Sequence, residues 1–303
     1  MTQIRFDNRV AIVTGAGGGL GRSHALLLAS RGAKVVVNDL GGGVKGDGSS
    51  TSAADAVVAE IKAAGGQAVA NYDGIDTMAG AEKLVATAKE AFGKLDIVIN
   101  NAGILRDISF QKMTEEDWTK VLQVHLFGSM YVCKAAWPLL RENNYGRLVF
   151  TTSAAGLYGN FGQANYSAAK MGIVGLAKTL AHEGAKANIK SNVIAPVAKS
   201  RMTETILPPN VLENLKTELV SPLVAYLASE TCQDTAQVYA VGGGYVSRVA
   251  VVESAGTNFD PKNALSPEDV AERWKAINDL SAAKPYANAM EAAGAALAVA
   301  MKS

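Results

Sequence analysis

The sequence predicts an α/β fold in which a parallel sheet is covered by helices on both faces. Three observations predict it. Short apolar runs of strand length recur along the chain, longer helical patterns separate them, and a glycine-rich turn follows the first run. Each helix returns the chain to the edge where the next strand starts, so alternating strands and helices give a parallel sheet.

The first strand is predicted at residues 10–13, and it leads into the glycine-rich turn at residues 14–21 and then a helical pattern through Arg31. Glycines allow the backbone to approach a pyrophosphate, and the free N–H groups of a helix start bind the anion. A glycine-rich turn alone is also compatible with a flexible loop. Here strand, turn and helix follow one another in the required order, which favours a dinucleotide site.

The second strand is predicted at residues 34–37 and is followed by Asp39. An acidic residue about 20 positions beyond the glycines can bind the adenosine ribose hydroxyls and repel a 2′-phosphate, so Asp39 favours NAD over NADP. A role for Asp39 as a turn cap is the alternative. Arg22 could pair with a phosphate, but we interpret it as a solvated helix residue.

The remaining elements continue the alternation. Strands are expected at residues 67–71, 95–99, 147–152, 189–194 and 237–241, and helices at 52–64, 78–92, 115–140, 165–187 and 212–228. Ligands of such sheets bind at the carboxyl ends of the strands. Polar residues stand at or just beyond those predicted ends: Thr14, Asp39, Asp73, Asn101 and Ser153.

Two segments interrupt this rhythm. Residues 41–52 form a Gly/Ser-rich insertion, expected as a surface loop near the adenosine, with a second phosphate cradle as the alternative. Residues 244–303 are expected to extend the same domain, so that residues 1–303 make one domain. Within the extension, 249–252 could form a short strand, Ser266 precedes a helix start, and 287–300 reads as a helix or a frayed tail.

Ser153, Tyr166 and Lys170 form the candidate catalytic group. Tyr166 and Lys170 share one helix face because they are four residues apart. A nearby ammonium is expected to lower the pKa of the phenol from its usual value of about 10, and the serine hydroxyl can bind a substrate oxygen. The three could move a proton on and off a carbinol oxygen. Taken singly, a surface pair and a strand-end turn former are the alternatives.

The motif TGxxxGxG at residues 14–21, the NNAG at 100–103, Ser153 and the YxxxK of Tyr166 and Lys170 resemble the short-chain dehydrogenase/reductase family over about residues 7–244. The resemblance implies a doubly wound sheet of seven strands, the Rossmann fold. It also implies hydride transfer between NAD and a secondary alcohol or ketone, with Ser153, Tyr166 and Lys170 catalytic. In the family the lysine also grips the nicotinamide ribose.

The resemblance further implies that Asn101 to Gly103 lie against the adenosine side of the cofactor, that Asp73 contacts adenine, and that Thr203 lies near the nicotinamide carboxamide. A purely structural turn is the alternative for 101–103. The complete set of expected cofactor-binding residues is Gly15, Gly19, Leu20, Gly21, Asp39, Asp73, Asn101, Ala102, Gly103, Tyr166, Lys170 and Thr203.

Two positions depart from the family pattern. His125 stands where the family commonly has asparagine, and it could act either as a proton relay or as a packed helix residue. Val197 follows Pro196 at a position where the family commonly has glycine.

Longer motifs, among them residues 100–107, 158–166 and 200–203, resemble a subgroup of the family, the (3R)-hydroxyacyl-CoA dehydrogenase part of peroxisomal multifunctional enzymes of type 2. This implies 3-hydroxyacyl-CoA as substrate. Side chains that could line an acyl cleft, or else pack in the core, are Leu157, Tyr158, Phe161 and Met202. Cations that could bind coenzyme A phosphates, or simply be solvated, are Arg106, Lys112, Lys199 and Arg201. A hydroxysteroid (17-beta type) or other alcohol dehydrogenase and a non-catalytic NAD sensor are the alternatives.

Composition narrows the class of protein. The net charge of +1 gives no electrostatic signature of nucleic-acid or membrane binding. The 2 cysteines and 3 histidines lack disulfide or metal-ligand patterns, so no metal is expected. No targeting signal is visible, which indicates a cytoplasmic location. The small residues of 165–187 call for burial beyond one sheet face, and the family resemblance implies that this helix pairs with its copy in a homodimer or homotetramer. Burial within one subunit is the alternative.

Overall fold

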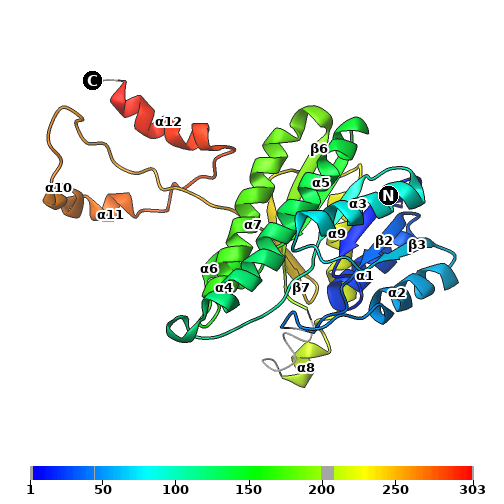
Figure 1. The fold of residues 1–303 in the computed structure, drawn as a ribbon. Helices are drawn as coiled ribbons and strands as arrows, with labels where there is room; N and C mark the ends of the chain where they lie inside the picture. Colours follow the sequence, from blue (N-terminus) through cyan, green and yellow to red (C-terminus); the bar gives the residue numbers. More distant parts are fainter. Residues whose placement is uncertain (1–2, 44, 199–207, 302–303) are drawn as a thin grey trace. The chain divides into compact units, whose positions relative to one another are not determined.

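The structure is a computed structural model that describes residues 3–43, 45–198 and 208–301, and the side chain of Pro209 lies outside the description. It divides into two compact units, residues 1–248 and 249–303 (Figure 1). The expectation that 244–303 extends the same domain stays a prediction. None of the helices in the described ranges is long and apolar enough to cross a membrane.

An eight-stranded sheet forms the centre of the first unit, in the order β3-β2-β1-β4-β5-β6-β7-β8. The strands are β1 Val10–Thr14, β2 Lys34–Asn38, β3 Gln67–Asn71, β4 Ile97–Asn100, β5 Gly146–Thr151, β6 Ile189–Pro196, β7 Val238–Gly242 and β8 Tyr245–Val249. From β3 across to β7 every neighbouring pair is parallel. The order reverses at β1, between β2 and β4, which is the doubly wound arrangement that the sequence predicted, with β8 added.

The helices of the first unit are α1 Gly19–Ser30, α2 Ser52–Ala63, α3 Met78–Phe92, α4 Glu115–Leu122, α5 Gly128–Glu142, α6 Ala154–Tyr158, α7 Ala164–Glu183, α8 Pro209–Leu212 and α9 Ser221–Ala228. Short 3₁₀ turns occur at Phe110–Lys112, Ala185–Ala187 and Thr217–Leu219. Helices lie on both sides of the sheet in Figure 1. The central strands β1, β4 and β5 are buried along their whole length, as expected for a sheet covered on both faces.

Two predicted helices differ from the observed ones. The single helix expected at 115–140 is interrupted by a π-helical turn, Gln123–Phe127, between α4 and α5. The helix expected at 212–228 is wrong over its first part, because α9 begins only at Ser221. Pro222 explains the later start, since proline fits the first turn of a helix and breaks its interior.

The second unit contains α10 Pro267–Glu272, α11 Trp274–Ile277 and α12 Ala289–Ala300. Ser266 begins α10 as predicted, because its hydroxyl accepts from the amide of Asp269 in a capping box. The alanine-rich end is a helix capped by Asn288. The strand expected at 249–252 is wrong: beyond Val249 the only pairing in this stretch is an isolated antiparallel bridge between Glu253 and Lys284.

Candidate active site

The turn between β1 and α1 has the features of an anion-binding cradle. Gly18 begins α1 without a side-chain cap, and the first turn of α1 carries no acidic residue, so neither supplies a negative charge to the N-terminal amides. Among the described residues, a Cβ at Gly18 or Gly19 would meet no atom within 4 Å, and Gly19 has a φ of +51°. A Cβ at Gly21 would lie 2.2 Å from the Gly15 carbonyl oxygen, so only glycine lets α1 pack this closely. The cradle therefore fits a pyrophosphate.

Asp39 lies at the end of β2 and holds two glycine amides. One carboxylate oxygen accepts from the Gly17 amide at 2.7 Å, and the other accepts from the Gly41 amide at 2.7 Å. The turn-cap alternative is thus present in the structure. A carboxylate offers about four acceptor sites, so it retains capacity for ribose hydroxyls. Arg22 is bound to Glu60, with a shortest distance of 2.6 Å, and so is already occupied by a carboxylate.

Asn101 ties the ends of β1 and β4 together. Its side-chain amide donates to the carbonyls of Thr14 at 3.0 Å and Gly15 at 3.1 Å, while the Thr14 hydroxyl accepts from the amides of Asn101 and Ala102. Asp73 follows β3 and accepts from the Asn71 side chain at 2.9 Å. These residues all lie at the carboxyl edge of the sheet, the edge that binds ligands in this fold class.

Ser153, Tyr166 and Lys170 come together where β5 ends. Ser153 caps α6, and its hydroxyl accepts from the Ala155 amide at 3.2 Å. Lys170 is 3% exposed and donates from Nζ to the Thr151 carbonyl at 2.7 Å. Its Nζ lies 5.5 Å from the centre of the Tyr166 ring. A Cβ on Gly156 would lie 2.6 Å from the Lys170 Cβ, so this glycine lets α6 pack closely on α7.

The expected acidity of Tyr166 is wrong for this structure. Burial raises the pKa of the phenol above its usual value, hydrogen bonding with Ser153 lowers it in part, and the charge of Asp107 raises it further. Burial lowers the pKa of Lys170 to about 7, so the amine loses its charge before the phenol titrates and contributes little to the phenol's pKa. The phenol is therefore held protonated, in the form that donates a proton to an alkoxide.

His125 packs against Tyr166 from the π-helical turn. Its ring meets the Tyr166 ring edge-on, with centroids 5.2 Å apart and an interplanar angle of 88°. Nε2 lies 3.0 Å from the Ile104 amide and 2.8 Å from the Ile104 carbonyl oxygen, while Nδ1 is buried and has no hydrogen-bond partner within the described part of the chain. Burial lowers the pKa of His125 well below its usual value, with Lys170 adding to the effect. His125 is thus a packed, neutral imidazole, and its relay role stays untested.

Gly103 makes room for that imidazole. A Cβ at Gly103 would lie 2.2 Å from Cε1 of His125. The glycine of the NNAG motif is therefore required here by a side chain from the helix that follows. A π-helical turn, which is frequent at functional sites, gives that side chain its position.

Asn165 is a residue whose role the sequence reasoning missed. It is fully buried, donates to the carbonyls of Arg106 at 3.2 Å and Asp117 at 3.0 Å, and accepts from the Tyr166 amide at 2.7 Å. These contacts fix the start of α7 and hence the backbone at Tyr166. An asparagine directly before the tyrosine of the motif was the available signal.

The side chains expected to contact the substrate divide into three groups. Tyr158 and Phe161 are 76% and 90% exposed, so the alternative of core packing is wrong for both. Arg106 is engaged with three carboxylates instead of standing free, and Lys112 is exposed. Three of them lie outside the described part of the chain: Lys199, Arg201 and Met202. Thr203, which was expected near the nicotinamide carboxamide, lies outside it too.

Comparison with known proteins places this geometry in context. Residues 9–209 match the family described as short chain dehydrogenase. A protein of Mycobacterium tuberculosis named as a short-chain type dehydrogenase/reductase, Rv0148, is 57% identical over 278 residues, which are 92% of this chain and 96% of the relative. Peroxisomal multifunctional enzyme type 2 of Mus musculus is 54% identical over 284 residues, 93% of this chain but 38% of the mouse protein.

Among solved structures, 7 alpha-hydroxysteroid dehydrogenase complexed with NADH and 7-oxo glycochenodeoxycholic acid superposes with a TM-score of 0.72. It is 27% identical, and the match covers 80% of this chain and 98% of that one. The expectation of a cytoplasmic location is wrong by these comparisons, because the mouse relative and those of Neurospora crassa and Saccharomyces cerevisiae are named as peroxisomal.

Proposed function

The chain belongs to the short-chain dehydrogenase family, and from this premise we propose that it oxidises (3R)-3-hydroxyacyl-CoA to 3-oxoacyl-CoA with NAD. At the coarser level it is an oxidoreductase that acts on CH–OH groups with a nicotinamide cofactor. The observation that carries the proposal is the gathering of Ser153, Tyr166 and Lys170 at the carboxyl end of β5, on the same edge of the sheet as the glycine cradle after β1.

Each side chain has a distinct task in the proposed reaction. The amides of Gly19 to Gly21 would hold the pyrophosphate, Asp39 a ribose of the adenosine, and Lys170 the nicotinamide ribose. The bound nicotinamide accepts or supplies a hydride. Ser153 binds the carbinol oxygen, and Tyr166, whose phenol is protonated in this structure, donates a proton in reduction. In oxidation the phenol must first lose its own proton before it can take the proton of the carbinol. The Lys170 amine, with a pKa of about 7, can gain and lose a proton beside that phenol at neutral pH.

Two contacts support NAD over NADP. Asp39 is held at the end of β2 by the amides of Gly17 and Gly41, where its charge opposes a 2′-phosphate. Arg22 could otherwise receive that phosphate, but both oxygens of Glu60 lie 2.6 Å from one of its nitrogens. A phosphate at this position would therefore have to displace an ion pair.

The acyl-CoA assignment is supported by similarity to the mouse enzyme over nearly the whole chain. Because the match covers only 38% of the mouse protein, we propose for this chain only the dehydrogenase reaction and no other activity of that protein. The exposed rings of Tyr158 and Phe161 beside α6 and α7 suit an apolar substrate. A hydroxysteroid is the second candidate, because the superposed structure named above binds a steroid.

We also propose a homodimer or homotetramer that pairs α7 with its copy. Ala168, Met171, Gly175 and Thr179 are exposed at helical spacing along one side of this helix. Such a stripe of mostly small side chains allows two helix backbones to approach closely.

The test is NADH formation from (3R)- and (3S)-3-hydroxyacyl-CoAs and from hydroxysteroids, each with NAD and with NADP. We expect turnover of the (3R)-hydroxyacyl-CoAs with NAD. Turnover of steroids alone would support the second candidate. Binding of NADH without turnover of any alcohol would support the alternative of a non-catalytic sensor.

A further inference from the structure

Arg106 joins three segments that are distant in sequence. Its Nε donates to the carbonyl of Lys45 at 3.2 Å, and one guanidinium nitrogen lies 3.6 Å from Asp47. The other terminal nitrogen lies 2.8 Å from Glu116 and 3.6 Å from Asp117, in the first turn of α4. The Arg106 side chain is only 15% exposed. Its charge is thus balanced by carboxylates of this chain, so it is not a free cation awaiting a phosphate.

The segment that Arg106 grips is the insertion, defined here by its described residues 41–43 and 45–51. The two ends of the insertion lie side by side. The Ser50 amide donates to the Leu40 carbonyl at 3.0 Å, and a Cβ on Gly41 would lie 1.9 Å from the Ser50 carbonyl oxygen. Gly46 has a φ of +83°, and a Cβ there would lie 3.1 Å from Cδ1 of Ile104. The insertion is therefore a closed loop whose tip rests on the segment that contains Arg106.

The other side of that segment reaches the catalytic tyrosine. Asn165 donates to the Arg106 carbonyl at 3.2 Å and accepts from the Tyr166 amide at 2.7 Å. A second pair of contacts runs in parallel, since the Ile108 amide donates to the Gly162 carbonyl at 2.8 Å. A continuous set of contacts thus leads from the insertion, which follows Asp39, to the start of α7.

We propose that Arg106 is a positioning residue that braces the insertion against α7, so that the adenosine side of the cofactor site and Tyr166 keep a fixed geometry. The inference rests on the proposed function only in requiring a nicotinamide cofactor. The insertion leaves the carboxyl edge of the sheet directly after Asp39, where the ribose of the adenosine would lie. Arg106 therefore acts on cofactor affinity through the insertion and on the phenol through Asn165.

The experiment compares Arg106→Ala and Asp47→Asn with Arg5→Ala. Arg5→Ala is the matched control, because it removes the same charge from an exposed pair with Asp7. The first measurement is Kd for NADH by calorimetry. If release of the insertion leaves one molecule in ten competent, Arg106→Ala raises this Kd about tenfold. Asp47→Asn loses one exposed ion pair and should raise it by roughly two- to fivefold.

The second measurement is the rate of trypsin cleavage after Lys45 in the protein without cofactor. It should rise in both variants and stay unchanged in Arg5→Ala. In turnover assays, Arg106→Ala should raise KM for NAD and lower kcat, with KM for the acyl-CoA little changed. Arg106→Lys should restore part of each effect, because it keeps the charge but loses the forked geometry.

Two results would contradict the proposed positioning role of Arg106. The first is an increase in KM for the acyl-CoA at unchanged Kd for NADH, which would make Arg106 a substrate-phosphate ligand. The second is cleavage and NADH binding in both variants equal to those of Arg5→Ala. Should no acyl-CoA be turned over, the proposed substrate fails, but calorimetry and proteolysis still decide this inference. Asp47 is 74% exposed, so its replacement tests the brace even if Arg106→Ala fails to fold.

Discussion

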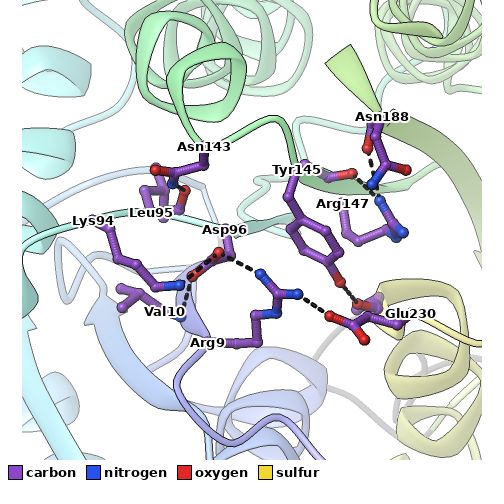
Figure 2. A network of polar contacts seen from close by, with 12 residues as sticks. Arg9, Val10, Lys94, Leu95, Asp96, Asn143, Tyr145, Arg147, Asn188 and Glu230 are labelled. Atoms are coloured by element: carbon purple, nitrogen blue, oxygen red, sulfur yellow. Dashed lines mark hydrogen bonds and ion pairs between the residues drawn. The ribbon is translucent and has the colours of Figure 1, made fainter. Parts of the chain in front are cut away.

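The two edges of the sheet are built on different principles. At the amino edge, where β1, β4 and β5 begin, charged groups meet their partners in a dense network (Figure 2). At the carboxyl edge, where the same strands end, several buried polar atoms have no hydrogen-bond partner among the residues that the structure describes. Both edges belong to one sheet with one set of buried strands. The paired charges of the amino edge therefore stabilise the fold, whereas the unpartnered polar atoms of the carboxyl edge are available to bind ligands.

Asp96 is the centre of the amino edge. Its side chain is 0% exposed and accepts from Arg9 at 2.9 Å, from the Val10 amide at 2.8 Å and from Lys94 at 3.0 Å. Arg9 also pairs with Glu230 and stacks on the Tyr145 ring, 3.6 Å from its centre. These contacts connect the starts of the strands to the segment after α9.

Arg147 completes this edge from the opposite face of the same ring. It lies 4.2 Å from the centre of the Tyr145 ring and donates to the carbonyls of Gly146, Asn188 and Ser229. Burial lowers its pKa, since no carboxylate pairs with it among the contacts that the structure describes. The tyrosine ring thus separates two guanidinium groups and attracts both.

At the carboxyl edge, several buried polar atoms lack hydrogen-bond partners among the described residues and are available to a ligand. The unpartnered atoms there include Asn100 Oδ1, His125 Nδ1 and Thr151 Oγ1, and Ser167 Oγ stands next to Tyr166. Such groups cost stability unless something pairs with them. A site that must bind and release ligands has to carry this cost.

The largest effect on activity without an effect on stability is expected at Tyr166, at the carboxyl edge. Tyr166→Phe removes the proton donor but keeps the ring contact with His125, so kcat should fall by roughly 10²–10⁴-fold with little change in Tm. Steady-state kinetics and thermal unfolding check this, with Tyr226→Phe on α9 as a control that should retain activity. Retained turnover in Tyr166→Phe would remove the phenol from the mechanism.

At Asp96, in the amino edge, we expect the opposite result: a loss of stability with unchanged activity. Asp96→Ala leaves Arg9 and Lys94 without their shared carboxylate, so unfolding free energy should drop by about 3–5 kcal/mol. The folded fraction should keep the kcat of the wild type, because the change is at the far edge. Urea unfolding and kinetics at low temperature measure both, with Asp7→Ala, at the exposed pair with Arg5, as the control. A loss of kcat with unchanged stability would reverse the roles assigned to the edges.

The cost of burying a charge at the carboxyl edge should appear in the pH dependence of stability through Lys170. Its pKa is lowered from 10.5 to about 7 by burial. Between these values the unfolded chain binds one more proton, so this residue makes stability rise with pH from about 7 to about 10.5. The destabilisation is complete below pH 7. The difference in unfolding free energy between wild type and Lys170→Met should therefore change by about 1.4 kcal/mol per pH unit in that window. A difference that is flat with pH would show that Lys170 is not desolvated.

Local patterns predicted most of the fold. The strand at 67–71 and the helix at 78–92 were predicted with their observed bounds, and the alternation gave the parallel order. The polar residues after each strand were predicted to gather at one edge because parallel strands all end there. The π-helical turn was not predicted, because one extra residue inside an amphipathic helix leaves the apolar pattern nearly unchanged.

The features that were not predicted depend on contacts between residues that are far apart in the sequence. The network around Arg106 uses residues 45, 47, 116 and 117, and no local pattern connects them. The pKa of Tyr166 was predicted in the wrong direction for a related reason. The spacing of Tyr166 and Lys170 gives their proximity, but burial, which lowers the charge of the lysine, is a property of the assembled fold.

The double hold of Asp39 on Gly17 and Gly41 limits how this protein could be re-engineered. A designer who wishes to change its coenzyme preference would replace the acidic side chain with a neutral one. That exchange would also untie the glycine turn from the insertion, so affinity for both coenzymes would suffer. A successful redesign must therefore supply new acceptors for two backbone amides before it gains any selectivity.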